Sequence, residues 1–346
     1  MTPIQKPLGF GIIGLGNIAG HHIKSILELQ NCKFVAASSR NKERLNQLEE
    51  QYKVDTYADY HQMMVHPEVD VVCICTPSGF HLEPALAAAG AGKHVIVEKP
   101  LEISVERGLQ MIQACEEANV KLACIFQNRY SPDYQKICDA VKGGELGKLV
   151  LGNAYIKWFR DQQYYDAADW RGSLSGDGGA ALINQSIHTI DLLLNVMGPV
   201  RSVFGKTKTM THDIDGEDLG LAILEFESGA LGTVEGSTSI YKGYPEKLEI
   251  HGSQGNIILE GGKIVEWNSE TAGNLPMSET ETSPTGSSDP MAIDYRLHKS
   301  QISEIIQHIC EDEEPIVNGK EGLKSVAVIE AIYESARTGK QVFIDQ

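Results

Sequence analysis

Short apolar runs alternate with segments of helical periodicity over residues 8–126. Five apolar runs are short and nearly continuous, as in strands that are buried on both faces of a sheet: FGIIGLG, KFVAASS, VDVVCICTP, HVIVEKP and KLACIF. Between them lie segments such as AGHHIKSILELQ, in which Ile23, Ile26 and Leu27 recur at helical spacing. This alternation predicts a parallel, doubly wound sheet with right-handed crossovers, which is the topology of a dinucleotide-binding domain.

A different pattern begins after Asn128. A helix is expected from Ser131, with Pro132 in its first turn and glycines at its end. The segments that follow, such as LVLGNAYIKWF and EKLEIHGSQGNIILEGGKIVEW, alternate apolar and polar residues and are divided by glycine-containing turns. This pattern is typical of hairpins in an antiparallel sheet with one covered face. One long helix is expected to interrupt the sheet at residues 178–197.

The length of the chain agrees with a division at this change of pattern. At about 150 residues per domain, 346 residues predict two domains. We predict an α/β protein whose N-terminal Rossmann dinucleotide-binding domain occupies residues 1–126. An α+β domain with an open, mainly antiparallel sheet is predicted at residues 127–346, where it would bind the substrate and form oligomer contacts. Residues 268–290 are polar and rich in Ser, Thr and Pro, and we expect a mobile loop there that could act as a lid.

Charge and composition narrow the range of partners. Thirty basic and 47 acidic residues give a net charge of -17, which disfavours nonspecific binding to nucleic acid and to anionic membrane surfaces. An anionic small substrate stays possible, because a local group of Lys and Arg can override the global field. The start of the chain lacks a signal-peptide pattern, and no apolar run approaches the ~20 residues that span a bilayer. The seven scattered cysteines are expected to be buried thiols, without a metal, in the reducing cytoplasm.

The segment GLGNIA follows an apolar run and precedes a helical segment. It has the form G-x-G-x-x-A in the strand–turn–helix context that dinucleotide binding requires. Gly14 would permit the tight turn, Gly16 the approach of the backbone to a pyrophosphate, and Ala19 the close packing of helix on strand. The phosphates would then lie at the helix N-terminus, beside Asn17 and Ile18, where N–H groups and the helix dipole favour negative charge. The alternative is a strand–turn–helix that binds no ligand.

The end of the second predicted strand bears on the choice of cofactor. An acidic residue at this point would hold the ribose 2′-hydroxyl of NAD, but the sequence here is SSRN. A charged hydrogen bond from Arg40 to a 2′-phosphate would contribute about 1.5–3 kcal/mol. We therefore favour NADP over NAD, with Ser39 and Arg40 near the ribose. In the alternative, NAD binds through Ser39, and Arg40 is a solvated loop residue.

The segment VEKP closes a predicted strand at its carboxyl end, which is the edge where open α/β sheets bind ligands. Glu98 could accept a hydrogen bond from a ribose hydroxyl, and Lys99 could hold the reacting oxygen of a substrate. The bond between Lys99 and Pro100 is a candidate cis peptide, which would aim the side chain. The alternative is an ordinary charge pair at the end of a strand.

The segment GDGGAALINQSIHTIDLLLNVMG holds the polar candidates of the second domain. Asn184 and His188 are four residues apart on one helix face, and Asp191 is close to the same side. Oxidation of a secondary alcohol needs a base for the hydroxyl proton, and histidine is the usual base near neutral pH. A hydrogen-bonded core histidine is one alternative. A metal site is the other, but asparagine is a poor ligand and no second histidine lies at ligand spacing.

Taken together, these segments resemble a known family. GLGNIA, TPSGFH, VEKP and GGAALINQSIHTIDLL are similar in order and spacing to the glucose–fructose oxidoreductase, inositol dehydrogenase and rhizopine-catabolism (Gfo/Idh/MocA) family over essentially the whole chain. The resemblance implies oxidation or reduction of a secondary alcohol of a sugar or cyclitol with NAD or NADP. It implies that Lys99 and His188 carry the chemistry, and that Thr76, Pro77 and His81 flank the cofactor.

Asn184 is a departure from the family's pattern, because many members have Asp at this position. Asparagine can orient an imidazole but cannot stabilise its charged form as a carboxylate would. The segments QNRYSP, QQYYDAADWRG and GAALINQSIHTIDLL are most similar to the branch that includes UDP-N-acetylglucosaminuronate 3-dehydrogenases. This resemblance implies oxidation at C3 of a pyranose, free or nucleotide-linked.

The same segments imply further contacts. The resemblance adds Gln127, Trp170 and Arg171 to the cofactor-binding residues. Arg129, Arg160 and Arg171 would suit an anionic substrate or the cofactor phosphates. The alternative for the three arginines is ordinary surface pairing in an acidic protein.

The expected function is that of an NAD(P)-dependent sugar dehydrogenase. His188, oriented by Asn184, would take the hydroxyl proton, and Lys99 would stabilise the charge that develops on the oxygen. The predicted substrate contacts are Lys99, Arg129, Asn184 and His188. Two alternatives are glycoside cleavage through transient oxidation with a bound dinucleotide and a non-catalytic dinucleotide sensor, although a sensor needs neither Lys99 nor His188. A homodimer or homotetramer is expected through the exposed sheet face.

Overall fold

The structure is a computed structural model that describes residues 6–270 and 294–344. The chain forms two compact units. The first unit comprises Met1–Gln127 and Asp294–Leu323, and the second comprises Asn128–Ile293 and Lys324–Gln346. The change of unit after residue 127 lies one residue from the predicted domain boundary, whereas residues 294–323 group with the first unit and not with the second. From residue 271 on, the expected lid lies outside the described residues.

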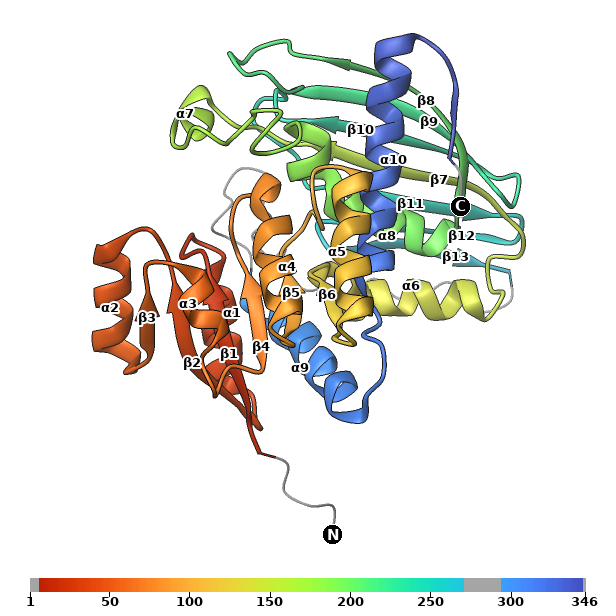
Figure 1. The fold of residues 1–346 in the computed structure, drawn as a ribbon. Helices are drawn as coiled ribbons and strands as arrows, with labels where there is room; N and C mark the ends of the chain where they lie inside the picture. The colour runs from red at the N-terminus through yellow and green to blue at the C-terminus, as the bar shows by residue number, and fades with distance from the viewer. Residues whose placement is uncertain (1–5, 271–293, 345–346) are drawn as a thin grey trace. The chain divides into compact units, whose positions relative to one another are not determined.

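The first unit contains a six-stranded sheet in the order β3-β2-β1-β4-β5-β6 (Figure 1). Every neighbouring pair in it is parallel, so the doubly wound Rossmann sheet is confirmed. Its strands are β1 (Leu8–Ile13), β2 (Cys32–Ser38), β3 (Asp55–Tyr57), β4 (Val71–Ile74), β5 (His94–Val97) and β6 (Leu122–Cys124).

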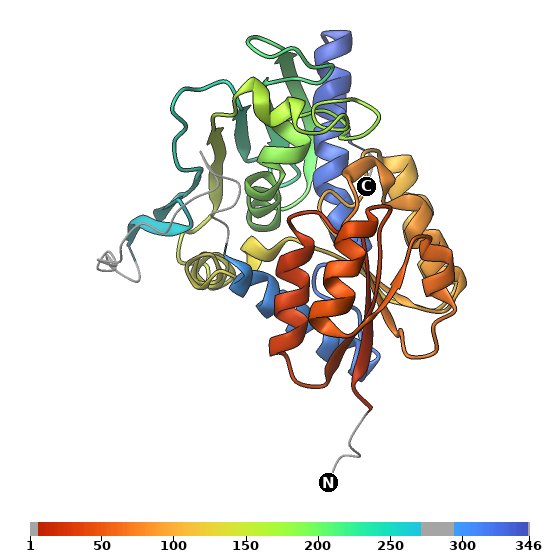
Figure 2. The same ribbon diagram turned by 90° about the vertical axis from the view of Figure 1, so that its left-hand side faces the viewer.

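Helices cover both faces of this sheet (Figure 1, Figure 2). Phe10 and Ile12 of β1 belong to the buried cluster that includes Ile23 of α1 and Ile302 of α9. A Cβ atom on Gly11, which points to the opposite face, would lie 3.0 Å from the Met63 side chain of α3. The helices are α1 (Ala19–Glu28), α2 (Lys42–Tyr52), α3 (Tyr60–Met64), α4 (Leu82–Gly90), α5 (Val105–Glu117) and α9 (Tyr295–Glu311).

Helix α9 packs in the first unit although it lies far along the chain. The Tyr295 hydroxyl and the Lys299 ammonium both bind the Glu28 carboxylate of α1, at 2.7 and 2.9 Å. The Gln301 amide group bonds the backbone of Cys124 and Phe126, at 2.8 and 3.0 Å. A division of the chain at residue 126 alone assigns α9 to the second domain.

The second unit contains an eight-stranded sheet in the order β13-β12-β11-β7-β10-β9-β8-β14. Its neighbouring strands pair in antiparallel fashion except for β7 and β10, which confirms a mainly antiparallel sheet. Its strands are β7 (Leu149–Lys157), β8 (Val200–Lys208), β9 (Leu219–Phe226), β10 (Leu231–Ser237), β11 (Lys247–Gly252), β12 (Gly255–Glu260), β13 (Lys263–Ser269) and β14 (Val342–Phe343).

Helices pack on one face of this sheet. A Cβ atom on Gly152 of β7 would lie 2.7 Å from the Met197 side chain of α8, so the glycine lets helix and strand approach closely. The expected helix at 178–197 is a π-helix, η3, that continues as α8. The helical elements of this unit are α6 (Pro132–Lys142), α7 (Gln162–Asp166), η3 (Ala181–Ser186), α8 (Ile187–Met197) and the part of α10 (Gly319–Thr338) beyond Leu323.

Within 6–270 and 294–344, every helix is too short or too polar to span a bilayer. Over the same ranges, no group of three His, Cys, Asp or Glu side chains is placed to hold a metal ion.

Candidate active site

The turn between β1 and α1 has the geometry of a phosphate site. Gly14 has φ +87°, and a Cβ there would lie 2.7 Å from the carbonyl of Cys75, so only glycine fits. A Cβ on Gly16 would meet nothing within 4 Å, so the second glycine faces open space. Helix α1 follows Ile18 and starts at Ala19 without a side-chain cap and without an acidic residue in its first turn. The positive end of the helix dipole therefore faces the turn uncompensated, which suits a pyrophosphate.

The residues after β2 form the start of α2. The Ser39 hydroxyl accepts a hydrogen bond from the backbone N–H of Asn41 at 3.1 Å, and the Asn41 side chain caps the helix. Arg40 is exposed. The Arg44 guanidinium on α2 donates to the carbonyl of Leu15 in the glycine turn. Sequence analysis missed Arg44, because an arginine in a polar helix gives no signal of this contact.

His81 connects the loops that follow β4 and β5. Its imidazole is 1% exposed, and its two nitrogens lie 3.0 Å from the carbonyl oxygens of Thr76 and Pro100. Pro77 lies in the first of these loops, immediately before a turn of 3-10 helix. Burial lowers the pKa of His81, so the neutral ring donates from one nitrogen at a time near neutral pH. The bond between Lys99 and Pro100 is cis, as predicted.

Glu98 is turned into the first unit. It is 5% exposed, and its Oε1 lies 2.8 Å from Nε2 of His22 on α1. Its Oε2 accepts a hydrogen bond from the backbone N–H of Lys99 at 3.3 Å. Burial alone would raise the pKa of Glu98, but the hydrogen bond with His22 and the nearby ring of His298 hold it well below its usual range. The contact of Glu98 with a ribose hydroxyl stays a prediction.

Gln127 offers a buried acceptor at the end of the first unit. Its side chain lies in the short helix η2 (Gln127–Tyr130) and is 3% exposed. Among the residues described, its Oε1 has no hydrogen-bond partner. A buried amide oxygen without a donor is costly, so this atom fits a cofactor group that donates a hydrogen bond. This acceptor and the glycine turn are features of the first unit that fit a dinucleotide, and the contact of Gln127 with a cofactor stays a prediction.

In the second unit, Asn184 lies in η3 and His188 in α8, so both project from one continuous helix. Asn184 is 9% exposed and His188 is half-buried. The Asn184 amide nitrogen donates to the Asp177 carboxylate, and its oxygen accepts a hydrogen bond from Gln185 at 2.7 Å. The amide group is therefore fixed at both ends. A π-helical turn at this point agrees with the frequent occurrence of such turns at functional sites.

Asp177 is a site residue that sequence analysis missed. It is 2% exposed, and its other oxygen accepts a hydrogen bond from the backbone N–H of Gly172 at 3.0 Å. A carboxylate therefore lies directly against Asn184, which stands where many family members have Asp. The only signal in the sequence is an acidic residue before two glycines, and this pattern is equally typical of an ordinary turn.

Arg129 is paired inside the second unit. Its Nε and Nη2 donate to the two carboxylate oxygens of Asp191 at 2.8 and 2.7 Å, and both side chains are buried. This bidentate pair compensates the charge of Arg129 inside the unit. The binding of substrate by Arg129 stays a prediction, and the pairing with Asp191 argues against it.

Two other arginines surround an aromatic cluster. The guanidinium carbon of Arg171 lies 4.2 Å from the ring centroid of Tyr164 and 4.9 Å from that of Trp170. The guanidinium carbon of Arg160 lies 5.4 Å from the same Tyr164 ring, and its Nη2 donates to the Gln185 side chain at 2.8 Å. Burial lowers the pKa of Arg160, so this cation is poorly hydrated. The cluster is thus joined through Gln185 to Asn184.

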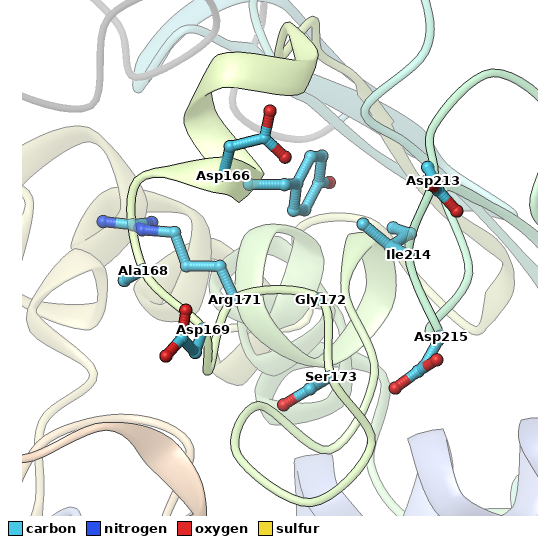
Figure 3. Close-up of a pocket in the computed structure, with 10 residues that line it drawn as sticks. Asp166, Ala168, Asp169, Arg171, Gly172, Ser173, Asp213, Ile214 and Asp215 are labelled. Atoms are coloured by element: carbon cyan, nitrogen blue, oxygen red, sulfur yellow. The ribbon is translucent and has the colours of Figure 1, made fainter.

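A cavity of about 260 Å³ lies beside this cluster (Figure 3). Figure 3 shows the guanidinium of Arg171 directed away from Asp213 and Asp215. Asp166 and Asp169 add two more carboxylates to the lining, so the cavity does not fit an anionic sugar. Its remaining lining residues are Tyr165, Ala168, Gly172, Ser173 and Ile214.

Each unit therefore assembles its own part of the predicted site. The glycine turn, the loop with His81, and Lys99 belong to the first unit. Asn184, His188 and the two arginines on the aromatic cluster belong to the second. That Lys99 and His188 meet at one carbinol stays a prediction.

Comparisons with known proteins agree with both parts. Residues 8–126 match the model of the oxidoreductase family with an NAD-binding Rossmann fold, and residues 134–258 match the GFO/IDH/MocA C-terminal domain. Myo-inositol 2-dehydrogenase of Thermotoga maritima is 27% identical over 97% of this chain and 98% of its own. scyllo-Inositol 2-dehydrogenase (NAD(+)) of Bacillus subtilis is 27% identical over 96% of this chain and 95% of its own.

A solved structure is also similar over nearly the full length. The WlbA dehydrogenase from Bordetella pertussis, in complex with NADH and UDP-GlcNAcA, is 31% identical with a TM-score of 0.87. The match covers 98% of this chain and 99% of that chain. The chain therefore belongs to the Gfo/Idh/MocA family and is an NAD(P)-dependent oxidoreductase that acts on CH–OH groups of sugars or cyclitols.

Proposed function

We propose that the protein oxidises the C3 hydroxyl of a pyranose that carries a carboxylate, of the UDP-N-acetylglucosaminuronate type. The observation that carries this proposal is the combination of Asn184 and His188 on one helix with 31% identity to a protein crystallised with UDP-GlcNAcA. The Arg160–Arg171 aromatic cluster supports an anionic substrate. Its cations lie on aromatic rings, and guanidinium groups bind carboxylates and phosphates in a bidentate manner.

Three side chains share the chemistry in this proposal. His188 takes the proton of the hydroxyl group. Asn184, fixed by Asp177 and Gln185, orients the substrate or the imidazole. Lys99 places an ammonium near the same oxygen and stabilises its developing charge. The nicotinamide, when bound, accepts the hydride.

The choice between NAD and NADP is part of the proposal. The end of β2 carries no carboxylate to repel a 2′-phosphate, and Arg40 is exposed beside it, which favours NADP. The NADH in the structure of the WlbA relative favours NAD. The ratio of kcat/KM with NADP to kcat/KM with NAD, measured in wild type and in Arg40→Ala, shows which cofactor the protein prefers. If NADP is preferred, the substitution reduces that preference about 10- to 100-fold.

The substrate is tested with one panel read by absorbance of reduced nicotinamide. The purified protein is supplied with each cofactor and with UDP-linked uronates, their neutral UDP-sugar counterparts, free sugars and inositols. We expect turnover to be fastest with a UDP-linked uronate, and Arg171→Gln to raise KM for the uronate more than for its neutral counterpart. Turnover confined to inositols or neutral sugars contradicts the proposal. Bond cleavage without reduced cofactor would instead indicate a glycoside-cleaving enzyme.

We also propose that the protein forms a homodimer or homotetramer through the open face of the eight-stranded sheet. Phe204, Leu221, Ile223 and Leu231 lie on three neighbouring strands and are between 41% and 56% exposed. Exposed apolar side chains grouped on one face favour a covering partner, and a second copy of this face is complementary to it. We expect Ile223→Arg to shift the protein towards the monomer in sedimentation, whereas a wild type that is monomeric at all concentrations contradicts the proposal.

A further inference from the structure

Three ionisable side chains from distant parts of the chain meet inside the first unit. His22 on α1 is 0% exposed, His298 on α9 is 1% exposed, and Glu98 directly follows β5. The Nε2 atoms of His22 and His298 lie 2.8 and 3.6 Å from the same Glu98 oxygen, Oε1. We call these three residues the His–Glu cluster. A carboxylate buried this deeply needs both charge compensation and hydrogen bonds.

The cluster reaches Lys99 through the other oxygen of Glu98. Oε2 accepts the hydrogen bond from the backbone N–H of Lys99, at 3.3 Å. On the other side of Lys99, the carbonyl of Pro100 is 3.0 Å from the buried His81 ring. Two buried imidazoles, one acting through a carboxylate, therefore hold the backbone on both sides of Lys99.

The charges of the cluster follow from the groups that face it. On α1 and at the start of α9, His21 and Asp294 lie close by, and the His21 ring is 5.2 Å from that of His298. Cys73 and Cys75 approach from β4 and the residue after it. Burial alone would lower the pKa of His22, but the cysteines and Glu98 raise it well above its usual value.

These neighbouring groups also determine whether Glu98 and His22 are protonated near neutral pH. Burial raises the pKa of Cys75, so near pH 7 the Glu98 carboxylate, 2.8 Å from Nε2, is the anion that favours the charged form of His22. Glu98 has its pKa well below the usual range because of His22 and His298, although burial opposes this. Near neutral pH, the cluster therefore contains a carboxylate on Glu98 and an imidazolium on His22.

We propose that His22 and His298 are positioning residues for Lys99. By holding the Glu98 carboxylate, they fix the backbone from which the Lys99 side chain reaches the substrate oxygen. This inference rests on the proposed function, because that function gives the position of Lys99 a catalytic consequence. In this inference the Glu98 carboxylate holds the Lys99 backbone and does not bind the cofactor ribose. Loss of the His–Glu cluster therefore lowers kcat without weakening dinucleotide binding.

The first test compares two substitutions of one residue. His22→Leu removes both the donor and the charge, whereas the amide nitrogen of His22→Gln can replace Nε2 as a neutral donor. We expect kcat to fall about 10- to 100-fold in His22→Leu, with the KM of the sugar and the Kd of the dinucleotide within about threefold of wild type. His22→Gln should keep most of kcat near pH 7 and lose the change at alkaline pH that deprotonation of His22 causes.

Met63→Ala is the matched control for lost packing. Met63 is 0% exposed in the same unit and packs beside Gly11, on the face of the sheet opposite α1. We expect this variant to lower Tm and to leave kcat unchanged. If His22→Leu also lowers only Tm, the cluster is merely structural and the proposal is overturned. The proposal is overturned as well if Glu98→Gln weakens dinucleotide binding tenfold or more, because the carboxylate would then serve the ribose.

A second readout does not depend on turnover. The pKa of Lys99 can be followed by NMR after reductive methylation with a ¹³C label, with Lys99→Arg identifying its signal. We expect this pKa to shift by about 0.5 unit or more in Glu98→Gln and His22→Leu, because the charges around the Lys99 backbone and the position of the ammonium both change. An unchanged Lys99 titration in both variants overturns the inference. A wild type that oxidises nothing in the substrate panel contradicts the proposed function instead, so the two failures are distinguishable.

Discussion

The two units build their parts of the site by different means. In the first unit, the backbone sets the site: a glycine turn, an uncapped helix start and the end of a strand. In the second unit, side chains set it, because Asn184 is held between Asp177 and Gln185, and Gln185 is held by Arg160. A site set by the backbone tolerates many neighbouring side chains, whereas a site set by side chains depends on each of them.

This difference predicts different responses to substitution. In the first unit, removing a reacting side chain should leave the cofactor site intact. In the second unit, replacing one buried polar residue should leave its partners unsatisfied and alter both stability and activity.

The largest effect is expected for Lys99→Ala. The substitution removes the ammonium that stabilises the developing charge, so kcat should fall by about 10²- to 10³-fold. The Kd of the dinucleotide should change less than about threefold, because the glycine turn is untouched. Steady-state kinetics and fluorescence titration measure the two quantities. Lys42→Ala, at an exposed position on α2, is the control. Lost dinucleotide binding with turnover retained would contradict the role of Lys99.

The same difference explains how much of the molecule the sequence predicts. The six strands of the first sheet include all five apolar runs that were predicted, because parallel strands buried on both faces are continuously apolar. Only the three-residue β3, which has no fully buried residue, gave no signal. The positive φ of Gly14 agrees with the predicted tight turn, and the candidate cis bond before Pro100 is cis.

Contacts between distant residues could not be predicted in this way. The packing of α9 in the first unit depends on Ile302 meeting the core around Phe10, which no local pattern encodes. The role of Asp177 depends on its contact with Asn184 through a turn, and that of Arg44 on reaching the carbonyl of Leu15. In each case the residue type was visible, but the partner was set by the fold.

The second prediction concerns the buried pair of Arg129 and Asp191. Arg129→Leu removes the cation that compensates the buried Asp191 carboxylate, so the free energy of unfolding should fall by about 3–5 kcal/mol. The double substitution of both residues to Leu should regain most of this loss. Urea unfolding of the three variants measures both effects. A rise in KM with unchanged stability in Arg129→Leu would instead support the predicted contact with the substrate.

The third prediction concerns pH and the start of η3. The buried Glu217 carboxyl accepts hydrogen bonds from the N–H groups of Ala180 and Leu182 and from the hydroxyl of Tyr333, at 3.2, 2.7 and 3.0 Å. Burial raises its pKa from 4.5 to about 7, so the folded protein binds this proton more tightly than the unfolded chain does. Its stabilising contribution is complete below pH 4.5 and is lost as the pH rises to about 7, a change of about 3 kcal/mol.

Glu217→Gln should therefore flatten the decline of the unfolding free energy between pH 5 and pH 8. The neighbouring Asp218 supplies an internal control of opposite sign. Burial would raise its pKa, but backbone N–H groups of Thr211 and Met210 lower it to about 2. Its contribution is present above pH 3.8 and is lost as the pH falls to about 2, and Glu217→Gln should leave this acid-side loss unchanged. An unchanged decline above pH 5 would contradict the raised pKa of Glu217.

The smallest effect is expected for an exchange between Asp177 and Asn184. Asn184→Asp places two carboxylates in contact inside the second unit, which should lower the free energy of unfolding by about 1–3 kcal/mol at pH 8. The loss should shrink at pH 5, where one of the two carboxyls binds a proton. The double variant Asp177→Asn/Asn184→Asp restores one amide and one carboxylate, so its stability should return close to that of wild type. The single variants Asn184→Asp and Asp177→Asn provide the comparison. If their changes in unfolding free energy simply add in the double variant, the contact does not hold Asn184, and the second unit does not depend on its side chains as proposed.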